Sequence, residues 1–208
     1  FTKLVAHGRE QLVSLVVDGG QLQYNKPSTV VDFTSDNLKV LRQGDEKALS
    51  STFYASKSEE STKKIACGIL REVLNQNQGK PIVFILKGDL GAGKTIFAKG
   101  LGEVLGIERI ISPTYVIYYE YDVTIFRKMV TKFVHVDLYN VGDKNEFKHL
   151  GLEKYFVAGN ILCIEWGEKA GEIIDELKEK VKLIFVTIKH VDQNSREITI
   201  SKQGALII

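Results

Sequence analysis

The sequence has few of the residues that would cross-link it, bind zinc or anchor it in a membrane. Its two cysteines, Cys67 and Cys163, are far apart and have no second Cys or His at metal-ligand spacing. This pattern predicts reduced, buried thiols and argues against a disulfide or zinc framework. The longest apolar runs, such as Pro81–Leu86, are strand-sized and fall far short of the ~20 residues of a membrane span. With no signal-peptide pattern at Phe1, we expect a cytoplasmic protein that does not bind membranes.

An excess of charge of one sign is also missing. The 208 residues include 28 Lys and Arg against 26 Asp and Glu, which gives a formal net charge of +2, and 44% are hydrophobic. The apolar fraction supports a real core and excludes intrinsic disorder. The near-neutral balance argues against a general nucleic-acid binder with a strong basic field. The only methionine is Met129, so we expect that Phe1 is not the translation start.

The chain consists of two stretches of different character. At roughly 150 residues per domain its length corresponds to about 1.4 domains. Residues 1–50 are rich in Val and Leu and contain strand-like pieces at Ser28–Phe33 and Leu38–Arg42. We expect a short α+β segment from a second domain there, joined by a polar linker over Gln43–Ser51.

From Ser56 onward, helix-like and strand-like stretches alternate. Ser56 and Glu59 predict a helix-capping box. The helix that follows has one apolar face, formed by Ile65, Ala66, Ile69, Leu70, Val73 and Leu74. Ile82–Leu86 is apolar and β-branched, as expected of a central parallel strand covered on both faces. A second helix is predicted from residue 94 to about 105, with Gly106 as its C-cap.

The rest of the chain continues this alternation. Further strands are predicted at Val116–Tyr121, Lys132–Leu138, Ile161–Trp166, Leu183–Ile188 and Glu197–Ile200, the last two as a hairpin. Glu172–Val181 has the spacing of a helix. The pattern predicts an α/β domain over residues 51–208, with a mainly parallel central sheet flanked by helices.

One motif in this domain carries recognisable chemistry. The phosphate-binding P-loop pattern G-x-x-x-x-G-K-[ST] is matched by Gly88-Asp89-Leu90-Gly91-Ala92-Gly93-Lys94-Thr95, between a strand and a helix. Its glycines let backbone N–H groups point at phosphate oxygens, and the helix N-terminus adds partial positive charge. We expect Lys94 to bind the β- and γ-phosphates and the Thr95 hydroxyl to ligate Mg²⁺. No Asn-Lys-x-Asp signature for guanine follows, which favours ATP over GTP.

Two acidic residues end strands downstream of the P-loop. Asp137 ends the stretch 133–137 and Glu165 ends the stretch 161–165. Such carboxylates point into the crevice where α/β proteins bind ligands, and a P-loop enzyme needs one near its metal. The alternative for each is a solvated acid at a strand end. His135 alternates with Asp137 and therefore points to the same side of the strand. This position fits a functional histidine and a structural, hydrogen-bonded histidine equally well.

Two further features are placed relative to these acids, a short segment before Asp137 and a single residue after Glu165. Ser112-Pro113-Thr114-Tyr115 stands where P-loop switches carry a threonine that senses the γ-phosphate, although an ordinary turn also explains it. Trp166, the only tryptophan, follows Glu165 and is either a core residue or an aromatic wall beside the nucleotide.

Taken together, four motifs resemble the TsaE (YjeE) family, the P-loop ATPases needed for the threonylcarbamoyladenosine modification of tRNA at adenosine 37. The motifs are 88–95, Ser112–Tyr115, His135-Val136-Asp137-Leu138-Tyr139 and Ile164-Glu165-Trp166, and the resemblance covers roughly residues 52–202. It implies a Mg²⁺-dependent ATPase that forms ADP and phosphate. It also implies TsaD and TsaB as partners, with tRNA contacted only indirectly.

The resemblance also implies roles for single residues. Lys94 would bind phosphate, Thr95 and Glu165 would bind Mg²⁺, and Asp137 would serve hydrolysis. Thr114 would occupy a switch-like position, and Trp166 would lie beside the nucleotide. Ile96 stands in the nucleotide site where a second Thr is usual, and Tyr115 stands where Phe is commoner. Neither change removes a group that the chemistry needs. Val123–Thr131 is longer than expected between two strands.

The opening segment has a resemblance of its own. Val17–Gly20, Pro27–Asp32 and Val40–Gly44 look like the last part of a TsaC (YrdC-type) threonylcarbamoyl-AMP synthase domain, which suggests a TsaC–TsaE fusion. This resemblance places three residues at the synthase pocket, Ser28, Thr29 and Arg42. The basic motif that the synthase chemistry requires is absent from the 208 residues, so we expect no synthase activity from this segment alone. An unrelated β-rich extension is the alternative.

Two other functions compete with an ATPase. A small-molecule kinase on the same P-loop would usually need a lid with paired arginines, and the arginines after the P-loop are the unpaired Arg109, Arg127 and Arg196. A scaffold that binds nucleotide without useful turnover is the second.

Overall fold

The computed structural model describes residues 30–32, 39–42, 51–77, 79–123, 130–142, 144–170, 177 and 179–202; at 30–32, 39–42, 144, 145, 148 and 202 it describes the backbone alone. The chain divides into two units, Phe1–Ala48 and Leu49–Ile208. No helix among these described residues is both long and apolar enough to cross a membrane.

In the first unit, two short strands pair in antiparallel fashion. They are β1 (Val30–Asp32) and β2 (Lys39–Arg42), and both lie within strand-like pieces that the sequence predicts. Of the predicted pocket residues, Ser28 and Thr29 lie outside the described residues, and Arg42 is described by its backbone alone. The likeness to a synthase therefore stays a prediction.

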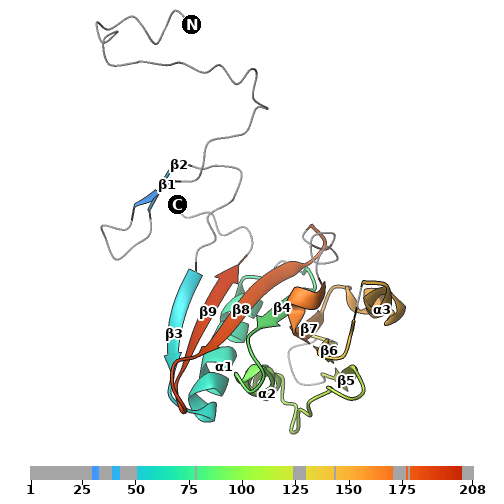
Figure 1. Ribbon diagram of the computed structural model, residues 1–208. Helices are drawn as coiled ribbons and strands as arrows, with labels where there is room; N and C mark the ends of the chain where they lie inside the picture. The colour runs from blue at the N-terminus through green and yellow to red at the C-terminus, as the bar shows by residue number, and fades with distance from the viewer. Residues whose placement is uncertain are drawn as a thin grey trace, which may run out of the picture. The chain divides into compact units, whose positions relative to one another are not determined.

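The second unit is built on a seven-stranded mixed sheet with the order β3-β9-β8-β4-β7-β6-β5 (Figure 1). Its strands are β3 (Ser51–Ser56), β4 (Ile82–Lys87), β5 (Tyr118–Asp122), β6 (Lys132–Asp137), β7 (Asn160–Glu165), β8 (Lys182–His190) and β9 (Arg196–Lys202). The four central strands β8, β4, β7 and β6 are parallel, and β9, β3 and β5 add to the sides in antiparallel fashion. The predicted α/β fold of the P-loop type is confirmed.

Helices cover both faces of this sheet. They are α1 (Glu59–Asn75), α2 (Lys94–Val104), α3 (Lys144–His149) and the 3-10 helices η2 (Leu152–Tyr155) and η3 (Gly167–Ala170). On one face lie α1 and α2 (Figure 1), and their apolar side chains share a core with Phe84 and Leu86 of β4. On the other, Val83 and Ile85 of β4 share a core with Phe147 of α3. Because β4 is buried on both sides, the P-loop that follows it starts from a rigid base.

The start of α1 differs from the prediction. The capping residue is Ser58, whose Oγ accepts the N–H of Ser61 at 3.1 Å. The predicted box of Ser56 and Glu59 is wrong, because Ser56 ends β3 and its side chain is buried. The Ser56 hydroxyl lies 3.0 Å from the Ser58 carbonyl and 2.8 Å from Thr62 Oγ1. A buried hydroxyl needs such partners, and here they are found within the strand-to-helix turn.

Strand β5 also begins later than predicted. Val116 and Ile117 lie in a turn in which both N–H groups donate to the carbonyl of Pro113, at 2.9 and 2.7 Å. Ile117 adopts a φ of 73°, which a strand does not allow. The C-cap of α2 is Leu105 rather than the predicted Gly106, which follows the cap with a φ of 72°, a left-handed conformation that glycine favours.

Some predictions fall partly or wholly outside the described residues. These are the linker 43–51, the loop 123–131 and the helix 172–181. Both cysteines are free as expected, but only Cys163 is buried. Cys67 is partly exposed, because it lies on α1 where α2 covers it from one side only, with its Sγ 3.1 Å from the Gly100 carbonyl.

Candidate functional site

The P-loop begins directly after β4 with Gly88, which no other residue could replace without displacing neighbouring atoms. Gly88 has a φ of +147°, and a Cβ there would lie 2.3 Å from the carbonyl oxygen of Ile188 on β8. Gly93 precedes α2 with a φ of +108° and supplies no side-chain cap. The first turn of α2 therefore has no side-chain cap from Gly93, and uncapped N–H groups at a helix N-terminus suit an anion.

Lys94 folds back over this loop. Its Nζ donates to the carbonyls of Gly88 and Asp89, at 2.8 and 2.9 Å. Burial lowers the pKa of Lys94, although the carboxylates of Glu165 and Asp137 oppose that effect. The two carbonyl oxygens accept the hydrogen bonds that phosphate oxygens would accept from Nζ, so the lysine is already placed above the loop.

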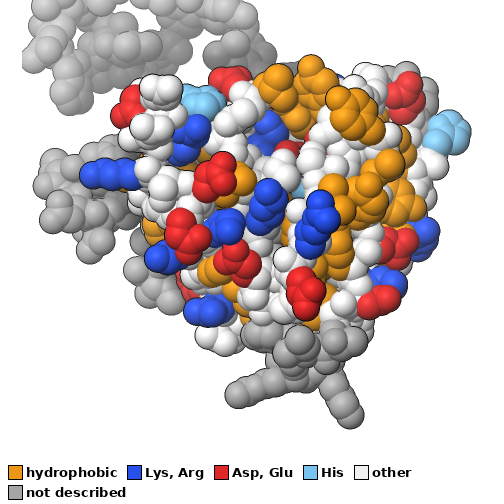
Figure 2. All heavy atoms as spheres, turned by 90° about the horizontal axis from the view of Figure 1, so that it is seen from below, with side chains coloured by type: hydrophobic (Ala, Val, Ile, Leu, Met, Phe, Trp, Pro, Cys, Tyr) orange, Lys and Arg blue, Asp and Glu red, His pale blue; other side chains and the backbone are white. Residues whose placement is uncertain are grey.

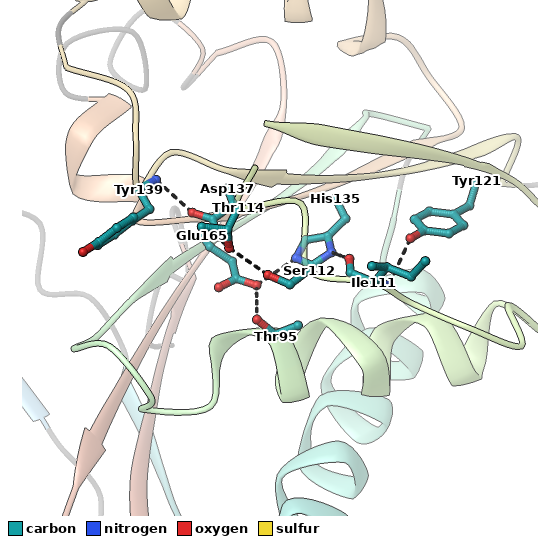
Figure 3. Close-up of polar contacts among 9 residues, drawn as sticks. All are labelled: Thr95, Ile111, Ser112, Thr114, Tyr121, His135, Asp137, Tyr139 and Glu165. Carbon is teal, nitrogen blue, oxygen red and sulfur yellow. Dashed lines mark hydrogen bonds and ion pairs between the residues drawn. The ribbon is translucent and has the colours of Figure 1, made fainter. Parts of the chain in front are cut away.

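Thr95 and Glu165 meet next to Lys94. Thr95 Oγ1 donates to Glu165 Oε1 at 2.8 Å (Figure 3). Glu165 ends β7, and the parallel register pairs it with Asp137 at the end of β6. Both carboxylates are 3% exposed. The structure thus brings Thr95, Glu165 and Asp137 together at the edge of the sheet that the sequence predicts, where charges are poorly solvated and a cation would be attracted.

The segment 111–117 closes this site from the side of Asp137. Thr114 Oγ1 donates to Asp137 Oδ2 at 2.6 Å, and the Tyr139 N–H donates to Oδ1 at 2.8 Å. Ser112 Oγ lies 2.8 Å from Thr114 Oγ1. Asn140 Nδ2 donates to the Thr114 carbonyl at 2.8 Å. The predicted switch-like threonine is therefore bound to the carboxylate that is expected to serve hydrolysis.

Trp166 lies between the P-loop and the Asp137 loop. Lys94 Nζ is 3.8 Å from the centre of its ring, and the ring of Tyr139 lies 5.2 Å away. Trp166 has a φ of 57°, and the next residue, Gly167, packs so tightly that a Cβ would lie 2.3 Å from Ile85 Cγ2. Of the two interpretations of Trp166, the geometry favours an aromatic wall beside the P-loop.

The remaining predicted residues of the loop contribute mainly backbone. Leu90 is 73% exposed at the tip of the loop, and the N–H of Ala92 donates to the Asp89 carbonyl at 3.1 Å. Ile96 is half-buried in the first turn of α2. Gly91 has a φ of +76° with open space around its Cα. These positions shape the loop, while Lys94 and Thr95 carry the side chains that the sequence predicts to bind phosphate and Mg²⁺.

The contacts of two residues could not be predicted from the sequence. His135 Nε2 lies 2.8 Å from Glu165 Oε1, and its Nδ1 lies 3.1 Å from the Ile111 carbonyl. Arg196 Nε donates to the Ala92 carbonyl at 3.2 Å and joins the β8–β9 hairpin to the P-loop. The alternation of His135 with Asp137 indicated which side the histidine faces. Arg196 carries no such signal, because its partner is 104 residues away.

The oxygen atoms present fit Mg²⁺ only if a nucleotide contributes to its shell. Among the residues that the structure describes, no three His, Cys, Asp or Glu side chains form a metal cluster. Mg²⁺ commonly uses one or two protein carboxylates together with substrate phosphates. Neighbouring oxygens in an octahedral shell with bonds of about 2.0–2.1 Å lie roughly 2.9 Å apart. The Thr95 and Glu165 oxygens, 2.8 Å apart, already have that spacing.

One groove borders the site. It has a volume of about 380 Å³, lies beside Thr95 and Ser112 and is lined by Lys63, Lys99, Glu103 and Arg109 among others. Another groove, of about 490 Å³, lies between β3 and the β8–β9 hairpin, beside Arg196 and Lys57. Figure 2 shows one face of the molecule, on which basic and acidic side chains are interleaved with apolar groups. This face carries no field of a single sign, in agreement with the near-neutral composition.

Comparisons with known proteins agree with this geometry. Residues 56–198 match the family model described as "Threonylcarbamoyl adenosine biosynthesis protein TsaE". The chain is 40% identical over 123 residues to the tRNA threonylcarbamoyladenosine biosynthesis protein TsaE of Bacillus subtilis, covering 59% of this chain and 70% of that protein. It is 35% identical over 135 residues to the protein of the same name in Haemophilus influenzae, covering 64% and 78%.

A solved structure is similar as well. The crystal structure of YdiB from Bacillus subtilis superposes with a TM-score of 0.53 at 30% identity, covering 76% of this chain and 90% of that one. The matched residues 56–198 contain the P-loop, the Thr114 segment and both strand-end carboxylates. The chain therefore belongs to the TsaE family of threonylcarbamoyl adenosine biosynthesis proteins.

Proposed function

We propose that the chain is a Mg²⁺-dependent ATPase of the tRNA threonylcarbamoyladenosine system. The observation that carries this proposal is the convergence of the P-loop, Thr95 and two buried carboxylates, Asp137 and Glu165, at one edge of the sheet. The curated relatives named for tRNA threonylcarbamoyladenosine biosynthesis support the pathway.

In the proposed mechanism, Lys94 leaves the carbonyls of Gly88 and Asp89 and donates to the phosphates, while the P-loop N–H groups bind the same oxygens. Thr95 and Glu165 would hold Mg²⁺, which supplies Lewis-acid stabilisation of the charge on the phosphates. Asp137 orients the attacking water and accepts its proton when its bond to Thr114 opens. The fixed donors stabilise the charge that spreads over the transferred phosphoryl group.

Partners are part of the proposal. Thr114 connects the hydrolytic carboxylate to the exposed segment 111–117, in which Tyr115 is 95% exposed. A change at the γ-phosphate would therefore alter a surface that another protein can sense. We expect slow turnover by the chain alone and faster turnover with TsaD and TsaB, with tRNA contacted indirectly. The N-terminal unit is proposed to be the end of a fused TsaC-like synthase domain, inactive by itself.

Asp137→Asn tests the ATPase directly. We expect phosphate release with TsaD and TsaB present to fall by about 10²–10⁴-fold, because general-base assistance is lost, while nucleotide affinity changes little. Asp122→Asn is the matched control, because Asp122 ends β5 and is an exposed ion-pair partner of Lys132. If the wild type and Asp137→Asn both release no phosphate with TsaD and TsaB present, the result would contradict the ATPase and favour a nucleotide-binding scaffold.

A small-molecule kinase is the second candidate, because the groove of about 380 Å³ beside Thr95 and Ser112 could hold an acceptor. Its polar lining, with Lys99 and Arg109, fits a small charged molecule. Product analysis separates the two functions. ADP and free phosphate in equal amounts support the ATPase, and a phosphorylated acceptor refutes it.

A further inference from the structure

His135 occupies a position that the proposed mechanism does not use. It lies in β6, in register with Cys163 of β7, and its side chain is fully buried. Its two ring nitrogens face different parts of the site (Figure 3). Nε2 is 2.8 Å from Glu165 Oε1, and Nδ1 is 3.1 Å from the carbonyl oxygen of Ile111.

Both neighbours of the ring are hydrogen-bond acceptors. The carbonyl of Ile111 can only accept, and Glu165 Oε1 also accepts the hydroxyl of Thr95 at 2.8 Å. The ring is rigid and fully buried, which leaves it little room to move between these two partners. A displacement of the Glu165 carboxylate would therefore reach the backbone at Ile111 through a single side chain.

Ile111 begins the segment that carries Thr114. Its N–H is bound by the hydroxyl of Tyr121 on β5 at 3.1 Å, and its carbonyl by His135 on β6. Both polar groups of this residue are therefore held by side chains of the sheet rather than by a local turn. Among the residues that the structure describes, only His135 contacts both this start of the segment and Glu165.

We propose that His135 is a positioning residue that couples the Glu165 carboxylate to the backbone of segment 111–117. The proposal rests on the proposed function in one respect, because the arrival of Mg²⁺ with a nucleotide at Thr95 and Glu165 is the event that is transmitted. His135 then has two effects: it orients Glu165 for the metal, and it reports the state of Glu165 to the segment that carries Thr114.

Two substitutions separate these effects. The side-chain amide of Asn reaches the position of Nδ1, so His135→Asn can keep the bond to Ile111 while it loses Glu165. The longer amide of Gln reaches the position of Nε2, so His135→Gln can keep Glu165 while it loses Ile111. Tyr121→Phe is the matched control, since it removes the other bond to Ile111 and does not touch Glu165.

The readouts are Mg²⁺ affinity in the presence of ADP and amide hydrogen exchange of residues 111–117, with and without Mg²⁺–ADP, on the full chain. In the wild type, Mg²⁺–ADP should change exchange in this segment by a factor within the usual coupling range of about 5–150. His135→Asn should lower Mg²⁺ affinity about 10–100-fold, as expected when the residue that orients a metal ligand is lost. His135→Gln should keep Mg²⁺ affinity near the wild-type value and lose the exchange response. Tyr121→Phe should raise basal exchange and keep the response.

A merely structural histidine predicts a different outcome. Both variants would then lose stability, while Mg²⁺ affinity and the exchange response stayed as in the wild type, and this would overturn the proposal. A wild type without an exchange response would also overturn it. If a variant does not fold, the ¹⁵N chemical shifts of the His135 ring can be measured in a protein whose other three histidines are replaced. Coupling requires the shifts of both ring nitrogens to change when Mg²⁺ is added to the ADP-bound protein, and unchanged shifts would overturn the proposal.

Failure of the two proposals can be told apart. An exchange response without any ATP hydrolysis, even with TsaD and TsaB, refutes the ATPase and leaves the coupling in place. If ATP is hydrolysed and both His135 variants keep the wild-type exchange response to Mg²⁺–ADP, the coupling is refuted and the ATPase is not.

Discussion

The P-loop and segment 111–117 face the same site but are held in place in different ways. The P-loop obtains its shape from its own backbone, through Gly88 at a φ of +147° and Gly93 at +108°. Segment 111–117 is held by side chains from β5, β6 and the loop after β6, with Thr114 bound to Asp137 as its central contact. The P-loop is specified mainly by adjacent residues, with one added bond from Arg196 to the Ala92 carbonyl, and segment 111–117 mainly by residues brought together by the sheet.

This difference predicts separate roles for the two regions, with nucleotide binding by the P-loop and a response to the bound nucleotide by segment 111–117. A loop whose shape is set by its own glycines is ready for an anion before the anion arrives, so little reorganisation is needed on binding. A segment held by a few side-chain bonds to the carboxylates that we propose to bind Mg²⁺ and serve hydrolysis should change when those carboxylates move. We therefore expect changes in the P-loop to affect nucleotide affinity, and changes in segment 111–117 to affect turnover.

The largest effect is expected for Gly88→Ala. The added Cβ would lie 2.3 Å from the Ile188 carbonyl, in a backbone conformation that disfavours a side chain. We expect a loss of about 2–5 kcal/mol in the free energy of unfolding, measured in urea, and loss of ADP binding in a calorimetric titration. Gly91→Ala is the control: it has open space and should cost only about 1–2 kcal/mol for its positive φ. Equal effects of the two variants would contradict the argument from close packing.

A smaller effect is expected for Thr114→Val. The change keeps the shape of the side chain and removes the hydroxyl that donates to Asp137 Oδ2. We expect the free energy of unfolding to fall by about 1.5–3 kcal/mol, the range for a bond to a charged group. ATP turnover should fall roughly tenfold with an unchanged Kd for ADP, as expected for about 1.4 kcal/mol of transition-state stabilisation.

Ser112→Ala is the control for Thr114→Val. Ser112 is exposed and bonds to Thr114 rather than to the carboxylate, so its removal should change the free energy of unfolding by no more than about 0.5 kcal/mol. A weaker Kd for ADP in Thr114→Val would show that the segment takes part in binding, and the proposed division between the two regions would then be wrong.

The smallest effect concerns the charge of Lys94. Burial lowers the pKa of Lys94, so the folded protein releases this proton at a lower pH than the unfolded chain, whose pKa is near 10.5. Between these two values the unfolded state holds more protons, and the free energy of unfolding rises with pH. The wild type should therefore gain stability relative to Lys94→Met as the pH is raised toward 10.5, in urea unfolding. Saturating ADP should remove this gain, and a difference that does not depend on pH would contradict it.

Much of the site could be predicted from the sequence, for a reason visible in particular residues. The P-loop pattern is contiguous, and the apolar strand before it and the amphipathic helix after it confirm its context. Asp137 and Glu165 could be placed at one sheet edge because parallel strands end on the same side. The boundaries were less certain: β5 begins at Tyr118 because the Pro113 carbonyl draws Val116 and Ile117 into a turn. The cap of α1 is Ser58 because Ser56 is buried.

The sequence by itself determined the fold class and the phosphate loop, and it predicted which side chains react, because each depends on neighbouring residues or on a short periodic pattern. The tertiary structure alone decided that His135 joins Glu165 to Ile111, residues that are 30 and 24 positions away from it. It also decided that Thr114 reaches Asp137 and that Arg196 reaches Ala92. These contacts depend on the register of β6 and β7 and on the position of the β8–β9 hairpin. That register arises from burial along the whole sheet, and no short stretch of sequence encodes it.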